Sequence, residues 1–213
     1  KSGCILQVGH LERFNPAVKK LREEMGQAVY IETQRLSYPT NRNLDVGVVW
    51  DLMIHDLDIL INLVNSPVVE IHAVGLSVYS DFEDVAQVQL IFKNGVVASL
   101  LASRVSGEKL RKLKVTEEDG RTLSLDFIDQ TLVEMNPPLL GKSVAPEYLA
   151  VNKDEPLRLE LSHFADCVRM HKTPLVSGED GKRALELAMQ VLARMKMVKT
   201  RAPLGKELTA LAG

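Results

Sequence analysis

Residues 48–64, "VVWDLMIHDLDILINLV", combine an apolar helical pattern with polar residues at helical spacing. Drawn at about 100° per residue, these polar residues fall within an arc of roughly 60°, and we call them the polar line: Asp51, His55, Asp58 and Asn62. A carboxylate one helical turn from an imidazole fixes its tautomer, favours its charged form and raises its pKa. Asp51 and His55 have that spacing, which predicts a general base for a hydroxyl proton.

The ordinary explanation of such a line is the water-facing side of an amphipathic helix. Two observations weaken it. The arc is narrow and is bordered by Leu52, Ile59 and Leu63, and residues 43–92 contain no Lys or Arg to balance the acids. The polar line therefore suits a cleft better than open water.

A metal site is the rival chemistry, because Asp51, His55 and Asp58 are all potential ligands. Zinc sites usually offer two or more His or Cys side chains, and no second His stands at ligand spacing here, so we predict no metal. His10 remains a candidate because it borders an expected domain junction, where ligand sites are favoured. The other histidines are expected to be structural or exposed: His72, His163 and His171.

The segments around the polar line read mostly as strands. Residues 28–38 and 68–80 are rich in β-favouring residues. Asn-Gly at 94–95 and Asp-Gly at 119–120 separate alternating apolar runs, the strongest short-range indication of a hairpin. We therefore expect a mainly antiparallel sheet.

Three further helices are expected. Asn15 should cap a helix that begins at Pro16 and stops at Gly26. Two amphipathic helices are expected over residues 156–172 and 177–198.

The last of these helices opens with Ser177 and, three residues on, Asp180, the capping-box pattern. Residues 4–8 read as a short buried strand. Together these elements predict an α+β fold, a mainly antiparallel sheet with helices packed on one face.

Composition excludes several classes of function. The 213 residues are 46% hydrophobic and 25% charged, enough for a sizeable core. A net charge of −2 without a basic stripe predicts no nucleic-acid partner, and no apolar run approaches the roughly 20 residues that span a membrane. Cys4 and Cys167 form no CxxC motif, which favours a reducing, cytoplasmic location.

Three stretches together resemble the C-terminal half of the Gfo/Idh/MocA oxidoreductases: "VGHLERFNPAVKKL", "VVWDLMIHDLDILINLV" and "PLRLELSHFADCVRMHKTPLVSGEDGKRALELAMQVL". They stand in the family's order, and the resemblance covers essentially the whole chain. Family members are two-domain, NAD(P)-dependent dehydrogenases of sugars and polyols. Within the family, the motifs look most like the branch that oxidises the 3-hydroxyl of UDP-N-acetylglucosamine.

The resemblance implies roles for individual side chains. The family's Asp-x-x-x-His pair maps onto Asp51 and His55. His55 would accept the hydroxyl proton while hydride leaves the same carbon for the nicotinamide, and Asp51 would orient and tune His55. The implied substrate contacts are Arg13, Asn15, Gln34 and Arg35, for each of which a surface ion pair or a helix cap is the alternative.

The resemblance also implies two domains with different roles. Residues 1–10 look like the end of the last strand of a nucleotide-binding domain, and residues 11–213 like the domain that binds substrate and forms oligomers. The sequence has no GxGxxG turn and no Glu-Lys-Pro motif. NAD or NADP would therefore be bound mainly by an N-terminal domain that this chain lacks, and the 213 residues alone should be inactive.

Two expectations concern partners. The sheet face without helices should pair with a second copy, in a homodimer or homotetramer. The alternative to an enzyme is a non-catalytic module that keeps the fold and binds a sugar or a partner chain.

Overall fold

A computed structural model describes residues 3–40, 44–137 and 145–199. The helices are the 3₁₀-helix η1 (Leu11–Phe14), α1 (Pro16–Glu24), the π-helix η2 (Val49–Met53), α2 (Ile54–Val64), α3 (Pro156–Met170) and α4 (Gly178–Arg194). The strands are β1 (Ala28–Leu36), β2 (Val68–Ser77), β3 (Val85–Phe92), β4 (Val97–Ser103), β5 (Leu110–Glu117), β6 (Thr122–Asp126), β7 (Thr131–Met135), β8 (Glu147–Leu149) and β9 (Met195–Lys199).

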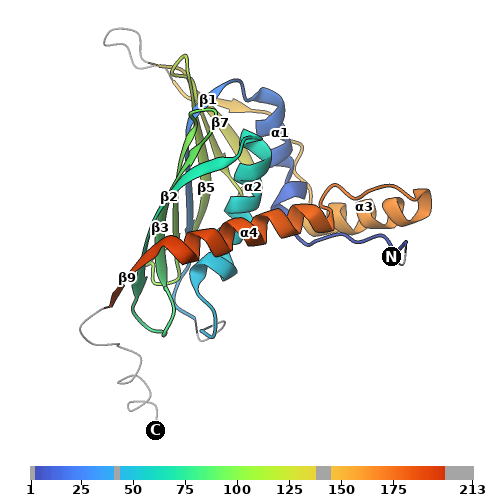
Figure 1. Cartoon of the computed structure of the whole chain (residues 1–213). Coiled ribbons are helices and arrows are strands. Elements are labelled where there is room, and N and C mark those ends of the chain that lie inside the picture. Colours follow the sequence, from blue (N-terminus) through green and yellow to red (C-terminus); the bar gives the residue numbers. More distant parts are fainter. Residues whose placement is uncertain (1–2, 41–43, 138–144, 200–213) are drawn as a thin grey trace.

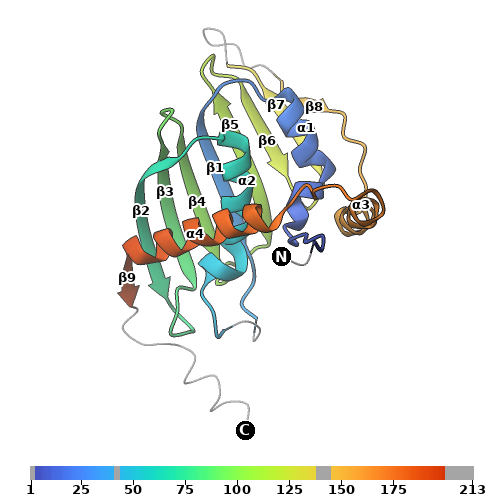
Figure 2. The same ribbon diagram turned by 45° about the vertical axis from the view of Figure 1, so that its right-hand side comes forward.

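The strands form one nine-stranded sheet in the order β8-β7-β6-β5-β1-β4-β3-β2-β9. β1 pairs in parallel with β4, and β2 with β9, whereas the other neighbours are antiparallel. The helices of the described residues all lie on one side of the sheet, with α2 and α4 across its middle and α3 projecting beyond it (Figures 1 and 2). The predicted α+β class, with helices on one face, is confirmed.

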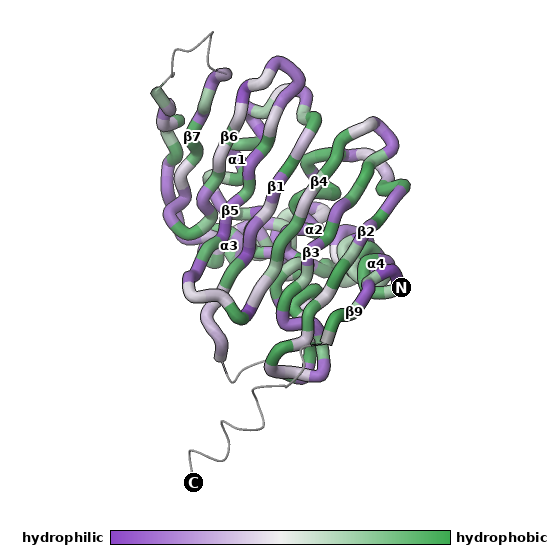
Figure 3. The backbone as a smooth tube through the Cα atoms, turned by 90° about the vertical axis from the view of Figure 1, so that its left-hand side faces the viewer, coloured by the Kyte–Doolittle hydropathy of each residue, from purple (hydrophilic) through white to green (hydrophobic). Residues whose placement is uncertain are grey.

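The alternation of strand side chains decides which residues reach the helices. In β1, Ile31, Thr33 and Arg35 are buried beneath the helical layer, while Gln34 is exposed on the opposite face. We call that opposite face the open sheet face. Figure 3 shows the strands from that side, with polar and apolar residues alternating along them.

The predicted caps and turns are present. The Asn15 side chain accepts a hydrogen bond of 3.0 Å from the Ala17 N–H at the start of α1. Ser177 and Asp180 form the capping box of α4. Gly95 and Gly120 have φ of 89° and 85°, which a residue without Cβ adopts readily, and each turns a hairpin.

Two predicted elements are wrong. Residues 4–8 form no strand; within the described chain they contribute a single bridge between Gln7 and Ser177. The last helix ends at Arg194 rather than at residue 198, and the following residues pair with β2 as β9. The Met195 side chain packs closely over Gly75, where a Cβ would lie 2.4 Å from the Met195 sulfur.

No helix within the described ranges is long and apolar enough to cross a membrane.

Candidate active site

The helix that carries the polar line begins as a single π-helical turn. In η2 the Ile54 N–H donates to the Val49 carbonyl, a bond from residue i+5 to residue i. Asp51 lies in this turn and His55 in the first turn of α2. The two residues are therefore not separated by an ordinary α-helical turn, and π-turns are frequent at functional sites.

The polar line does not face open water. Asp51, His55 and Asn62 are only partly exposed, and Asp58 is 1% exposed. The water-facing explanation is therefore wrong, and the line lies in the partly enclosed position that its narrow arc predicted.

His55 is a neutral imidazole at pH 7. Burial, reinforced by the positive charge of Arg35, lowers its pKa to about 4, and Asp56 opposes that shift. The expectation that a neighbouring carboxylate raises this pKa is wrong because desolvation dominates. Its Nδ1 is buried and has no hydrogen-bond partner among the residues that the structure describes, which leaves Nε2 as the nitrogen that can meet a substrate.

The cation that acts on His55 is held in a buried ionic cluster. Nε and Nη2 of Arg35 lie 3.1 and 2.8 Å from the carboxylate oxygens of Asp56, and Nη1 lies 3.3 Å from Glu12. Burial would lower the pKa of Arg35, but these two acids hold it above its ordinary value. The guanidinium also lies over the Phe127 ring, 5.3 Å from its centroid. Arg35 is thus a fixed charge beneath the site.

A second group of buried side chains adjoins His55. The rings of His10 and His55 meet edge to face with centroids 6.1 Å apart. Arg13 contacts Asp58 at 3.4 Å and donates to the Leu175 carbonyl at 3.3 Å. Three buried atoms around His55 have no hydrogen-bond partner in the described chain: His10 Nδ1, His55 Nδ1 and Asp58 Oδ2. Unsatisfied buried polar atoms are rare and point to a functional site or a bound molecule.

Two sequence-predicted contacts lie outside this group. Asn15 is 1% exposed, caps α1 and donates to the Phe127 carbonyl at 3.0 Å, so its side chain is used by the fold. Gln34 points to the open sheet face, and its neighbours in register are Leu101 on β4 and Lys112 on β5. The structure thus separates Gln34 from Arg35, because adjacent residues of a strand face opposite sides.

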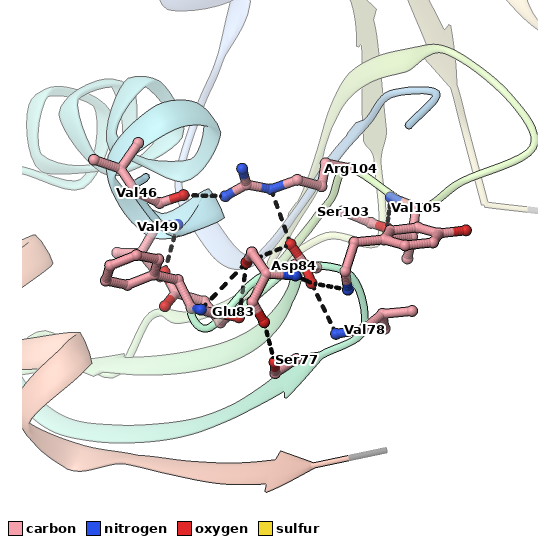
Figure 4. Close-up of polar contacts among 12 residues, drawn as sticks. Val46, Val49, Ser77, Val78, Glu83, Asp84, Ser103, Arg104 and Val105 are labelled. Carbon is pink, nitrogen blue, oxygen red and sulfur yellow. Dashed lines mark hydrogen bonds and ion pairs between the residues drawn. The ribbon is translucent and has the colours of Figure 1, made fainter. Parts of the chain in front are cut away.

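Sequence reasoning missed the cluster that supports η2 (Figure 4). Glu83 accepts a hydrogen bond of 3.1 Å from the Val49 N–H, and Arg104 donates to the Val46 carbonyl. Arg104 Nε lies 3.4 Å from Asp84. These buried groups fix the start of the helix that carries Asp51 and His55. The only indication of this cluster in the sequence was the pair of adjacent acids, Glu83 and Asp84, shortly after the strand predicted at residues 68–80.

A cavity of about 700 Å³ lies between α1, α2, α3 and residues 150–154. His55 does not line it, but Asn62, at the other end of the polar line, does. Its other polar lining residues include Arg13, Lys19, Lys20, Arg22 and His163. Within the described ranges, no group of three His, Cys, Asp or Glu side chains is placed to hold a metal ion.

Comparisons with known proteins place this architecture. Residues 21–122 match the model of the GFO/IDH/MocA C-terminal domain. The chain is 34% identical to the UDP-N-acetylglucosamine 3-dehydrogenase of Acidithiobacillus ferrooxidans over 88% of this chain and 61% of the relative. It is 27% identical to the scyllo-inositol 2-dehydrogenase (NAD(+)) of Bacillus subtilis, over 89% of this chain and 60% of that relative.

A solved structure of the Acidithiobacillus ferrooxidans UDP-N-acetylglucosamine 3-dehydrogenase aligns with a TM-score of 0.82, over 90% of this chain and 61% of that one. The chain thus spans about 61% of the length of this relative. The match to the family's C-terminal domain, the 34% identity and the shared fold agree, and the chain belongs to the GFO/IDH/MocA family.

Proposed function

We propose that this chain is the catalytic and substrate-binding domain of an NAD(P)-dependent dehydrogenase that oxidises a sugar or sugar-nucleotide hydroxyl. The observation that carries the proposal is His55, a neutral, half-buried imidazole within the partly enclosed polar line. Relatives that act on UDP-N-acetylglucosamine and on scyllo-inositol support it.

In this mechanism Nε2 of His55 accepts the proton of the substrate hydroxyl. A bound nicotinamide supplies the hydride acceptor, and we propose that it is held mainly by a part of the protein outside these 213 residues. The buried Arg35 charge disfavours the imidazolium form of His55, so the accepted proton is readily passed on. Asp51, in the π-turn, is proposed to orient His55.

The proposed substrate is UDP-N-acetylglucosamine, oxidised at its 3-hydroxyl. Support comes from the 34% identity to the Acidithiobacillus ferrooxidans enzyme and from the match to its structure.

His55→Asn tests the proposal in the full-length enzyme. Loss of the base should lower kcat by about 10²–10⁴, with the urea unfolding midpoint nearly unchanged. His171→Asn is the matched control, because His171 is exposed, and its positive φ of 51° suits Asn. A fully active His55→Asn enzyme would refute the role assigned to His55, whereas a wild-type protein without dehydrogenase activity would favour the non-catalytic module.

We further propose a homodimer or homotetramer formed through the open sheet face. This face carries exposed apolar side chains such as Val74 beside polar ones, and the described helices all lie on the other side. Light scattering at micromolar concentration tests the assembly, and a monomer there contradicts it.

A further inference from the structure

The cavity at the Asn62 end of the polar line has the character of an anion site. We propose that it binds the phosphate-bearing part of the substrate, so that the enzyme acts on a sugar nucleotide rather than on a neutral polyol. This inference rests on the proposed function, since it places the reacting sugar at His55.

The position of the cavity fits such a ligand. His55, Ile59 and Asn62 lie on one face of α2, and the last two line the cavity. At 1.5 Å per residue, Asn62 stands about 10 Å along the helix from His55. That is the reach of a sugar ring and the phosphates attached to it, so one ligand can meet both.

The charges at the cavity favour an anion. Four cations line it, Arg13, Lys19, Lys20 and Arg22, against two acids, Glu23 and Asp154. Asp154 is already bonded to Arg158, and Lys20 to Glu24 at 2.5 Å. Lys19, Arg22 and Glu23 are exposed, and none of them forms an ion pair within the described chain. Positive charge therefore exceeds negative charge at the cavity, in a chain of net charge −2.

Arg13 lines the cavity and contacts Asp58 of the polar line, and its hydrogen bonds are long. Its contacts to Asp58 and to the Leu175 carbonyl measure 3.4 and 3.3 Å, longer than the roughly 2.7–2.9 Å of a strong charge-assisted hydrogen bond. The second oxygen of Asp58 has no partner in the described residues. A guanidinium held so loosely can direct its remaining N–H groups to a phosphate.

The cavity also has room for more than a monosaccharide. Its volume of about 700 Å³ lies within the roughly 300–1,000 Å³ typical of ligand pockets. Apolar side chains form much of its wall, which suits a flat heteroaromatic ring: Phe14, Val18, Ile59, Leu63, Val151 and Leu159.

Calorimetric titration of the 213-residue chain with UDP tests the site. We expect the Lys19→Glu/Arg22→Glu variant to bind UDP at least about 10-fold more weakly than the wild type, since each lost charged contact contributes on the order of 1.5 kcal/mol or more. Lys93→Glu/Lys109→Glu is the matched control, with equal charge change on exposed lysines that do not line the cavity. Equal affinity in the Lys19/Arg22 variant, or no binding at millimolar UDP, overturns the inference.

The full-length enzyme separates this inference from the proposed function. With UDP-N-acetylglucosamine, the Lys19→Glu/Arg22→Glu enzyme should show a KM raised about 10-fold with kcat nearly unchanged. If the Lys19→Glu/Arg22→Glu enzyme has an unchanged KM and the His55→Asn enzyme is inactive, the phosphate site in the cavity is refuted while the proposed dehydrogenase function stands. A fully active His55→Asn enzyme refutes the assigned base, while UDP titration still decides the cavity.

Discussion

Two groups of buried polar side chains lie near the central helix, and they differ in how fully their hydrogen bonds are made. We call the group that supports η2 the support cluster: Glu83, Asp84 and Arg104. There Asp84 accepts hydrogen bonds from the Val78, Tyr79 and Ser80 N–H groups at 2.7, 2.7 and 3.0 Å. We call the group beside His55 the site cluster: His10, Arg13, His55 and Asp58. There Asp58 has one 3.4 Å contact with Arg13 and an oxygen without a partner in the described chain.

The pKa values of the two carboxyls follow this difference. Burial pushes both upward, but the backbone hydrogen bonds hold the pKa of Asp84 below its ordinary value. The pKa of Asp58 stays raised, because burial outweighs His10 and Arg13. A satisfied buried carboxylate stabilises the fold, whereas an unsatisfied one costs stability and is expected where function requires it.

The largest effect should come from Asp84→Asn. The three backbone N–H groups share Oδ2 of Asp84, whereas Oδ1 accepts from the Ser80 hydroxyl and faces Arg104 Nε. An amide whose oxygen meets the N–H groups would turn its NH₂ group, a donor, toward Arg104, which then loses its buried ionic partner. We expect a loss of about 3–5 kcal/mol in the free energy of unfolding, measured by urea denaturation. Asp81→Asn, an exposed neighbour, is the control. A loss below about 1 kcal/mol would show that the support cluster is less important than its geometry indicates.

The next effect is the pH dependence that His55 imposes. Its pKa is about 4 in the folded state against about 6.5 unfolded. As pH falls below 6.5 the unfolded chain takes up this proton first, so stability is lost until about pH 4. By linkage the loss reaches up to about 3 kcal/mol.

His55→Asn should remove that part of the pH dependence between pH 6.5 and 4. Histidine NMR titration of the wild type measures the pKa directly. A His55 pKa at or above 6.5 in the folded protein would contradict both the predicted pH dependence and the lowered pKa assigned to this base.

The smallest effect, and the sharpest contrast, is Asp58→Asn. Asn keeps one oxygen for Arg13 but removes the charge of a carboxylate whose second oxygen has no partner in the described chain. Because this pair is incompletely hydrogen-bonded, we expect a loss of only about 1 kcal/mol or less in the free energy of unfolding at pH 7, measured by urea denaturation. The same Asp-to-Asn change thus has a much smaller consequence in the site cluster than in the support cluster. A loss as large as that of Asp84→Asn would show that Arg13 pairs with Asp58 more strongly than the 3.4 Å distance indicates.

The features that the sequence predicted well are governed by neighbours along the chain. The Asn15 cap, the Ser177 capping box and both glycine hairpins depend on residues a few positions apart. The partial burial of the polar line was also visible, because its arc is narrow and lacks cations.

The features that it could not predict depend on distant partners. Arg35 meets Asp56, 21 residues away, and this pair contributes to the lowered pKa of His55. Residues 195–199 pair in parallel with residues 73–77 of β2, which are far away in the sequence. The separation of Gln34 from Arg35 was foreseeable, however, since neighbouring strand residues always face opposite ways.

The π-turn at residues 49–53 makes the geometry of the site depend on chain length as well as on residue type. Its i+5 hydrogen bond encloses one residue more than an α-helical bond does. Deleting Leu52 would let the turn close as an α-helix, with Asp51 three residues before His55 instead of four. A single codon, with every functional side chain retained, thus changes the distance and direction at which the two side chains meet, although both stay on one helix face.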